Sequence, residues 1–338
     1  MKVVAITGER ECELVQRTDP RPAGDVVVVR NLIAPMCTEY KAYAAGRATD
    51  RLGHEAAGEV AEVAQPGRVK AGDRVVVMSR YPCGRCRLCL SGDYIHCQDG
   101  FDPLALTRSA AGNATYAQYV LKSDWLLLPV PNDMPLAHAS MACCGLGPTF
   151  GAMQRMQVDA FDTLLITGMG PVGLGGVVNA VFRGARVIAV ESHPYRARLA
   201  KELGAVAVVD PSGDNPLAEI MDLAQGEGVS AAIDCSGSAA AQRLLIDATR
   251  RRGRIAFVGE AGDLTLHVSS DLIRKGLTLY GQWHYSRADW PRMLQVISRS
   301  TELLDKMITH ELPMSRVKDA FELQTTGECG KVLLRPWD

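Results

Sequence analysis

The chain has 338 residues and a formal net charge of -1, with 37 basic and 38 acidic side chains. This length accommodates one large or two ordinary domains, and the near-neutral charge argues against nucleic acid or an anionic membrane surface as a partner. No apolar run approaches the roughly 18 to 20 residues that a membrane span needs. Ten cysteines without a recognisable secretory signal favour a reducing, cytoplasmic location in which thiolates bind metals.

Short β-rich runs mark the first part of the chain, to about residue 145. They occur at Val26–Val29, Glu59–Val63 and Arg74–Val77, and turns rich in Gly, Pro and Asp separate them. Runs of this length and composition, bounded by turn residues, are typical of strands. This part of the chain therefore predicts a small barrel-like β domain.

Scattered residues within this part offer the ligands of a metal site. Two thiolates and one imidazole leave a fourth position open, which is the ligand set of a catalytic zinc. A lone cysteine is more often a small buried apolar residue, and a lone histidine usually makes a structural hydrogen bond. Residue types alone therefore leave this site open. The candidates are Cys37, His54, Glu55 and the adjacent pair Cys143 and Cys144.

A second group of cysteines has a much more specific pattern. Cys83, Cys86, Cys89 and Cys97 are spaced as C-x2-C-x2-C-x7-C, which brings four thiolates within reach of one tetrahedral metal ion. Two disulfides are the alternative, but C-x-x-C pairs close strained loops. Four thiolates leave no open coordination position, so the spacing predicts a structural zinc rather than a catalytic one.

From about Asp162 apolar strands alternate with helical stretches, which predicts a doubly wound parallel sheet of six strands. A helical stripe that includes Leu174, Val177 and Val178 follows the first strand and is expected to pack on the sheet. A later helix is expected to stop at Gly204, where a positive φ suits glycine. The predicted strands are Thr163–Thr167, Val187–Val190, Val206–Val209, Ala231–Asp234, Arg254–Gly259 and Leu277–Gly281.

A G-x-G-x-x-G run over residues 168–173 follows the first of these strands and opens a helix. Alone the run is a weak signal, but the strand before it and the helix after it are the context of a dinucleotide site. Glu191 ends the second strand, where a carboxylate accepts hydrogen bonds from a ribose diol and favours NAD; a solvated helix-capping Glu is the alternative. The residues expected to bind the cofactor are Gly168, Gly170, Pro171, Val172, Gly173 and Glu191.

With these motifs in this order, the whole chain resembles the zinc-dependent medium-chain alcohol dehydrogenases and the related polyol dehydrogenases. The features that carry the resemblance are Cys37, Gly53-His54-Glu55, the four-cysteine lobe, Cys144 ahead of Gly151, and the Gly168 run. The resemblance implies an α/β fold in two domains. A GroES-like β-rich catalytic domain would span 1–148 and 285–338, with a zinc lobe at 83–97, and a Rossmann NAD-binding domain would span 149–284.

The resemblance also assigns roles. It implies two zinc ions per chain, NAD as cofactor, and a catalytic zinc bound by Cys37, His54 and Cys144, with Cys143 as the alternative to Cys144. Glu55 would be a neighbouring carboxylate or an alternative ligand. Arg196 is expected near the adenosine ribose, and Lys331 near the pyrophosphate.

One position departs from the family pattern. Two residues after the first ligand cysteine many relatives have Ser or Thr, whose hydroxyl passes the substrate proton outward, whereas this chain has Glu39. A carboxylate there would act as a general base or bind a polyhydroxylated or amino-bearing substrate. The alternatives are that Thr38 restores the hydroxyl relay, or that Glu39 turns away toward the backbone or Lys41.

The sequence thus predicts an NAD-dependent oxidoreductase that acts on a secondary alcohol, a polyol, sugar or cyclitol, and gives a ketone. A reductase of imines or activated alkenes is the first alternative, and a non-catalytic zinc-stabilised nucleotide-binding protein is the second. The predicted partners are a small alcohol or ketone and further copies of the chain in a homodimer or homotetramer, joined around Leu277–Tyr280. Trp283, His284 and Tyr285 are expected in the substrate pocket or in that interface.

Overall fold

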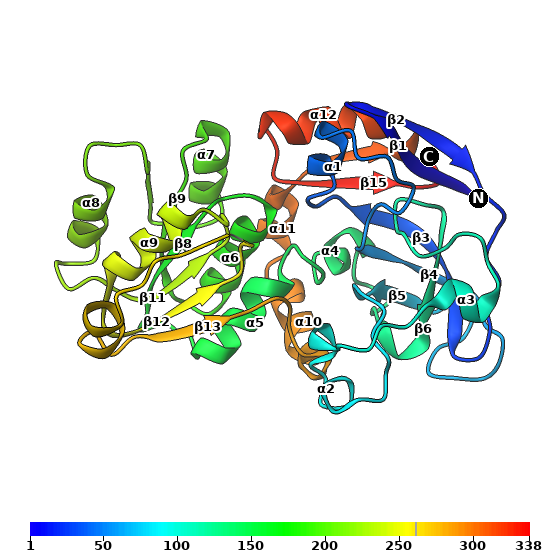
Figure 1. Cartoon of the computed structure of the whole chain (residues 1–338), viewed down its shortest axis with the longest axis horizontal. Coiled ribbons are helices and arrows are strands. Elements are labelled where there is room, and N and C mark those ends of the chain that lie inside the picture. Colours follow the sequence, from blue (N-terminus) through cyan, green and yellow to red (C-terminus); the bar gives the residue numbers. More distant parts are fainter. Residues whose placement is uncertain (261) are drawn as a thin grey trace. The chain divides into compact units, whose positions relative to one another are not determined.

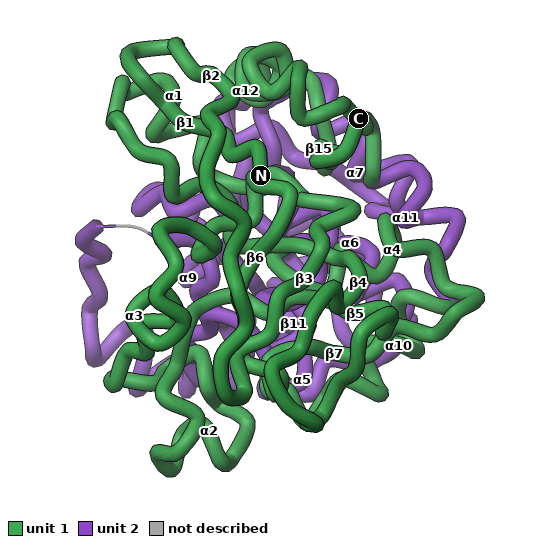
Figure 2. Tube along the Cα trace, turned by 90° about the vertical axis from the view of Figure 1, so that its right-hand side faces the viewer, with its two compact units in different colours: residues 1–144, 286–298, 308–338 green, residues 145–285, 299–307 purple. Residues whose placement is uncertain are grey.

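The structure is a computed structural model that describes residues 1–260 and 262–338, which form two compact units (Figures 1 and 2). Unit 1 comprises Met1–Cys144, Ser286–Ser298 and Ile308–Asp338. Unit 2 comprises Gly145–Tyr285 and Arg299–Met307. The predicted combination of a β-rich domain with a parallel α/β domain is confirmed.

Unit 1 is built around a mostly antiparallel sheet with the strand order β14-β15-β3-β4-β5-β7, in which β6 also pairs with β3. The β1-β2 hairpin lies outside this sheet. The strands are β1 Lys2–Gly8, β2 Glu11–Gln16, β3 Val26–Pro35, β4 Ala56–Glu62, β5 Arg74–Val77, β6 Tyr119–Ser123, β7 Leu127–Pro129, β14 Ile308–Pro313 and β15 Lys331–Arg335. The helices are α1 Tyr40–Ala44, α2 Arg87–Leu90, α3 Pro103–Thr107, α4 Leu136–Ser140, α10 Trp290–Arg299 and α12 Val317–Thr326.

The apolar run at the start of β3 explains why this strand is central in unit 1. Val27 and Val29 pack in one buried cluster with strands β4 and β5, whereas Val26 and Val28 pack in another beside Leu121. Successive side chains of a strand point to opposite faces of the sheet, so an unbroken apolar run is stable only where both faces are covered.

Unit 2 contains a parallel sheet that the described residues form in the order β10-β9-β8-β11-β12-β13. Figure 1 shows its helices on both sides of the strands, and the predicted doubly wound sheet is confirmed. The strands are β8 Thr163–Thr167, β9 Arg186–Val190, β10 Ala207–Val209, β11 Val229–Asp234, β12 Thr249–Phe257 and β13 Thr278–Gly281. The helices are α5 Gly147–Met156, α6 Pro171–Phe182, α7 Pro194–Glu202, α8 Pro216–Leu223, α9 Ala239–Ala248 and α11 Thr301–Met307, with a π-helical segment at Val268–Ile273.

Helix α6 is buried more widely than the predicted stripe on one face. A Cβ atom at Gly175 would lie 1.7 Å from the Gly145 carbonyl oxygen, so glycine allows this close approach of the backbone. Asn179 Nδ2 donates to the Leu146 carbonyl oxygen at 2.9 Å, which satisfies the side-chain amide donor beside α5. The helix after β9 ends at Glu202, and Gly204 has φ +111°, as predicted. None of the helices in the described part of the chain has the length and hydropathy to cross a membrane.

The two units differ from the predicted domain division in three places, the smallest being that Tyr285 lies in unit 2. The first segment of unit 1 ends at Cys144 instead of residue 148, and Arg299–Met307 lies in unit 2 although the prediction placed 285–338 in one domain. Helix α11 contacts α6 and α7, and its Leu304 and Met307 are buried. The chain therefore returns to unit 2 for one short helix, because that helix has an apolar face to cover.

Lys122 on β6 is an unusual charged residue, because its side chain is buried in unit 1. Its Nζ donates to the Arg80 carbonyl oxygen at 2.9 Å and lies 3.7 Å from the centre of the Tyr81 ring. Burial disfavours the charged ammonium and lowers the pKa of Lys122 to about 7. The amine is therefore a titratable group that links β6 to the segment leading into the four-cysteine lobe.

We predict that Lys122→Met raises the free energy of unfolding relative to wild type near pH 7, and that this difference shrinks toward pH 9. The pKa of Lys122 is lower in the folded state, so the unfolded chain binds more protons between the two pKa values. In that range the free energy of unfolding of the wild-type protein rises with pH by at most about 1.4 kcal/mol per pH unit. Urea unfolding at several pH values measures the difference. Exposed Lys70→Met is the matched control, and a difference independent of pH would contradict the prediction.

Candidate metal and dinucleotide sites

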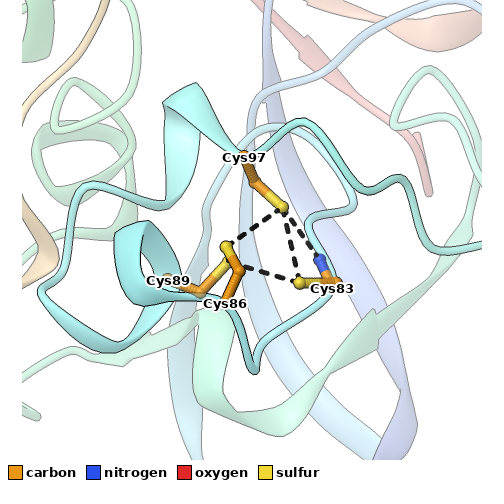
Figure 3. A group of neighbouring side chains, drawn as sticks. All are labelled: Cys83, Cys86, Cys89 and Cys97. Atoms are coloured by element: carbon orange, nitrogen blue, oxygen red, sulfur yellow. Dashed lines mark hydrogen bonds between the residues drawn. The ribbon is translucent and has the colours of Figure 1, made fainter.

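The four cysteines of the lobe converge on one point (Figure 3). The sulfur–sulfur distances are 3.5 Å for Cys86–Cys89, 3.6 Å for Cys83–Cys97, 3.7 Å for Cys86–Cys97 and 4.0 Å for Cys83–Cys89. Zn–S bonds of about 2.3 Å in a tetrahedron require sulfur–sulfur separations of about 3.8 Å. All four thiols are free, so the donor set and its size fit a zinc ion and not the alternative of two disulfides.

Local backbone geometry explains how this short segment folds around a common centre. Gly84 and Gly92 have φ values of +74° and +92°, so two left-handed turns reverse the chain between the cysteines. The Cys83 N–H donates to Cys97 Sγ at 3.4 Å. Hydrogen bonds from the backbone N–H groups of Arg85 and Cys86 lower the pKa of Cys83 to about 7, which favours the thiolate that a metal binds.

A second cluster of donors lies elsewhere in unit 1. Cys37 follows β3, His54 and Glu55 precede β4, and Cys144 follows α4. One ligand atom from each lies within 4.8 Å of the others, and His54 Nε2 is 3.2 Å from Cys144 Sγ. A hydrogen bond from Cys144 lowers the pKa of Cys37 despite its burial, so a thiolate is favoured here too. Two thiols and an imidazole fit a zinc ion with one position left open.

The structure distinguishes between the two adjacent cysteines. Cys143 is fully buried, and its Sγ donates to the Val77 carbonyl oxygen at 3.4 Å. Burial raises the pKa of Cys143, which keeps it a neutral thiol. Cys144 alone of the pair belongs to the donor cluster.

Glu39 lies against His54. Its Oε1 is 2.7 Å from His54 Nδ1, and its Oε2 accepts hydrogen bonds from the Cys37 N–H at 3.2 Å and from the Tyr116 hydroxyl at 3.0 Å. Burial would raise the pKa of Glu39, but the hydrogen bonds and charge of His54 outweigh it and lower the pKa to about 2. An ionised carboxylate is only an acceptor, so Nδ1 carries a proton. Nε2 faces Cys144 Sγ and is the nitrogen left to bind a metal, which would take the place of any proton there.

This arrangement differs from the expectation that Glu39 acts as a general base or binds the substrate, and it leaves the expected relay through Thr38 open. Both carboxylate oxygens are engaged within the protein, which argues against general-base chemistry and against direct binding of a substrate. Glu39 does bond the backbone, as one alternative expected, through the Cys37 N–H, but its other bonds go to His54 and Tyr116 rather than to Lys41. Tyr116 was not identified in the sequence, since no motif marks it and 77 residues separate it from Glu39.

A buried ion pair lies beside the same donors. Glu55 Oε1 is 2.8 Å from Lys331 Nζ, and Glu55 Oε2 accepts a hydrogen bond from the Cys144 N–H at 3.1 Å. Both side chains are fully buried. Burial raises the pKa of Glu55 to about 7, although Lys331 opposes this rise. Lys331 therefore neutralises a carboxylate of unit 1, and the expectation that it reaches a pyrophosphate is not supported.

The glycine-rich run has the local geometry of a dinucleotide loop. Gly168 has φ +80°, and a Cβ atom there would lie 2.7 Å from Ser236 Cα. A Cβ at Gly173 would lie 1.9 Å from the Gly168 carbonyl oxygen, whereas a Cβ at Gly170 would have no atom of the described residues within 4 Å. The first and third glycines are therefore required by packing, and the second leaves open space where a ligand can approach the backbone.

Glu191 lies next to this loop. Its Oε2 accepts a hydrogen bond from the Met169 N–H at 2.7 Å, and its Oε1 accepts one from the His193 N–H at 2.8 Å. A carboxylate in this place repels a 2′-phosphate and can accept from a ribose diol. On α7, Arg196 is half-buried, and its Nε is a buried donor without a hydrogen-bond partner in the part of the chain that the structure describes.

Comparison with known proteins shows the family of this chain. The family models described as "Alcohol dehydrogenase GroES-like domain" and "Zinc-binding dehydrogenase" match residues 22–132 and 171–299. L-threonine 3-dehydrogenase of Pyrococcus furiosus is 30% identical, with 98% of each chain covered. The chain belongs to the zinc-dependent medium-chain dehydrogenases. It is an oxidoreductase of the alcohol dehydrogenase type.

Two more comparisons extend this family assignment. Sorbitol dehydrogenase of Bacillus subtilis is 27% identical to this medium-chain dehydrogenase, covering 99% of this chain and 97% of that protein. The solved structure of alcohol dehydrogenase TADH from Thermus sp. ATN1 has a TM-score of 0.89, with 24% identity and 99% of each chain covered. That likeness supports the fold.

The three aromatic residues that follow β13 in this dehydrogenase differ in their exposure to solvent. They are Trp283, His284 and Tyr285. His284 and Tyr285 are each 2% exposed, and the Tyr285 ring packs edge-on against Phe150 with 5.6 Å between the centroids. Trp283 is 41% exposed. Internal packing thus accounts for Tyr285, and Trp283 is the one of the three with a substantial surface for a ligand or another subunit.

We predict that Glu39→Gln lowers zinc retention and turnover by about 10-fold to 100-fold, the usual effect of losing the partner of a metal-binding histidine. A glutamine amide group cannot accept from both the Cys37 N–H and the Tyr116 hydroxyl while its oxygen faces His54. Chelator competition and kinetics across the pH range measure the two effects. Exposed Glu62→Gln is the matched control, and wild-type zinc retention and pH profile in Glu39→Gln would contradict the prediction.

Proposed function

We propose that the protein is an NAD-dependent dehydrogenase that oxidises a secondary alcohol to a ketone and binds two zinc ions per chain. The observation that carries this proposal is the donor cluster of Cys37, His54, Glu55 and Cys144. Because Glu55 bonds Lys331 and the Cys144 N–H, the two thiols and the imidazole would leave one coordination position of a zinc ion open. The four-cysteine lobe offers no such position, and it would hold the second zinc as a structural ion.

The residues around the donor cluster of Cys37, His54 and Cys144 have separable roles in this proposal. Cys37, His54 and Cys144 would hold a zinc ion, which supplies Lewis-acid polarisation of the substrate oxygen when bound. Glu39 holds His54 with its Nδ1 protonated, so that Nε2 is the coordinating atom. Thr38 is exposed and adjacent to Cys37, and its hydroxyl is the group left to accept the substrate proton, since Glu39 is already engaged.

The loop at residues 168–173 and Glu191 would bind NAD, which supplies the hydride acceptor of the reaction. The open space at Gly170 admits a pyrophosphate close to the backbone, and the amino end of α6 favours its negative charge. Glu191 supports NAD over NADP. The Met169 N–H holds its carboxylate beside the loop at residues 168–173, where it would repel a 2′-phosphate. Arg196 offers a nearby donor for the adenosine ribose.

The substrate proposal is a polyol, sugar or cyclitol. Its support comes from the named substrate of the sorbitol dehydrogenase relative, and no longer from Glu39, whose oxygens bind His54 and Tyr116. The threonine dehydrogenase relative makes an amino-bearing secondary alcohol a competing class. Reduction of an activated alkene needs no metal donors, so the intact cluster argues against that alternative. Assembly as a homodimer or homotetramer stays a prediction.

A rate panel tests the function. NAD and NADP are compared against simple secondary alcohols, acyclic polyols, sugars, amino-cyclitols and L-threonine. We expect turnover with NAD and a polyhydroxylated or amino-bearing alcohol. Activity confined to simple apolar alcohols would contradict the substrate class, and faster turnover with NADP would contradict the role of Glu191.

Two cysteine substitutions test the assignment of the two metal sites. We expect Cys37→Ser to keep the fold and one zinc per chain while turnover is lost, because its cluster would perform chemistry. We expect Cys89→Ser to lower the melting temperature and impair assembly, because a closed four-thiolate site stabilises structure. Metal analysis, thermal melts and kinetics on both variants give the comparison. The opposite pair of phenotypes would show that the two roles are reversed.

A further inference from the structure

Asp234, the last residue of β11, is a fully buried carboxylate with an unusually complete set of donors. Its Oδ1 accepts from the Thr167 hydroxyl at 2.8 Å, the Ser236 N–H at 2.9 Å and the Ser236 hydroxyl at 2.6 Å. Its Oδ2 accepts from Gln242 Nε2 at 2.9 Å and the Gly237 N–H at 3.2 Å. These five donors are neutral groups, and they come from β8, the segment after β11, and α9.

The position of Asp234 in the sheet gives this network its significance. β8 and β11 are neighbours in the order β9-β8-β11-β12, so the chain connections leave these two strands in opposite directions. Ligands of doubly wound sheets bind outside the carboxyl ends of the strands at such a switch point. Asp234 and Thr167 are paired in register at the ends of the two strands, and the carboxylate of one bonds the hydroxyl of the other.

The network continues directly into the glycine-rich loop. Gly168 follows Thr167, and its Cα lies so close to Ser236 that a Cβ would be 2.8 Å from the Ser236 N atom. The Cys235 N–H donates to the Thr167 carbonyl oxygen at 2.9 Å. Asp234 therefore holds both surfaces of this contact, the end of β8 through Thr167 and the opposing segment through Ser236 and Gly237.

We propose that Asp234 is a positioning residue for the dinucleotide, which fixes the Gly168 turn in its binding conformation before the cofactor arrives. Fixing a loop in advance raises affinity, because binding then includes no loss of conformational entropy from ordering the loop. A buried carboxylate suits this task, since it accepts from several backbone and side-chain donors at once. The inference rests on the proposed binding of NAD and adds a residue that would not itself touch the cofactor.

Asp234→Asn tests the proposal. The amide group replaces one acceptor oxygen by a donor, so in either orientation at least two of the present donors lose their acceptor. We expect the dissociation constant for NADH, from fluorescence titration, to rise about tenfold, and the KM for NAD to rise while kcat at saturating NAD changes little. In the cofactor-free protein we expect faster amide hydrogen exchange at residues 168–170 and unchanged exchange in unit 1.

Exposed Asp222→Asn on α8 is the matched control and should alter neither quantity. Thr167→Val is the second variant, for use if Asp234→Asn does not fold, and we expect it to shift both readouts in the same direction through loss of one donor. Folded variants that bind NADH within twofold of wild type, with unchanged amide exchange at the loop, would overturn this inference and leave the proposed function untouched. Failure of the wild-type protein to bind NADH would overturn the proposed function as well.

Discussion

The hydrogen bond between Glu39 and His54 determines whether the donor cluster of Cys37, His54 and Cys144 can bind a metal ion. It is 2.7 Å long and partly buried, and its acceptor is a carboxylate whose pKa is lowered to about 2. A proton of the imidazole is therefore held on Nδ1, and Nε2 is the nitrogen that faces the thiols and is left to bind a metal. Without this bond Nε2 could carry the proton, and the two thiols would lose the third donor that makes an open zinc site.

The donor cluster also contains a second carboxylate, and its charge must be compensated. Glu55 lies fully buried beside the same thiols, and an isolated carboxylate there would be strongly unfavourable. Lys331, from the last strand of unit 1, offsets it with a contact of 2.8 Å. Because removal of one partner of a buried pair leaves an uncompensated charge, the pair ties β15 to the segment before β4. The loop segment that carries His54 and Glu55 is thus tied to a strand of the sheet.

Local sequence patterns predicted most of the fold and the four-cysteine lobe, because these depend on short spacings, whereas the resemblance to a family supplied the donors from Cys37 to Cys144. The strand β8 has its predicted bounds, and the glycine-rich run opens α6 as expected. The partners of the clusters were harder to predict. Lys331 lies 276 residues from Glu55, and its role depends on which strands become neighbours, which no short spacing encodes. Glu39 was recognised as a departure, but its side-chain direction follows from tertiary packing around Tyr116.

Glu39 and Asp234 illustrate one principle in two separate units. Asp234 is fully buried and Glu39 is largely buried, and both lie at or near the end of a strand. Each accepts a hydrogen bond from a backbone N–H and contacts a side chain that defines a binding residue or loop. A carboxylate has more acceptor sites than any neutral side chain, so one residue can order several segments. In unit 1 the ordered group is the imidazole of His54, and in unit 2 it is the turn at Gly168. Carboxylates that contact no ligand would then set the geometry of both binding sites, which is why sequence motifs that record only direct ligands omit them.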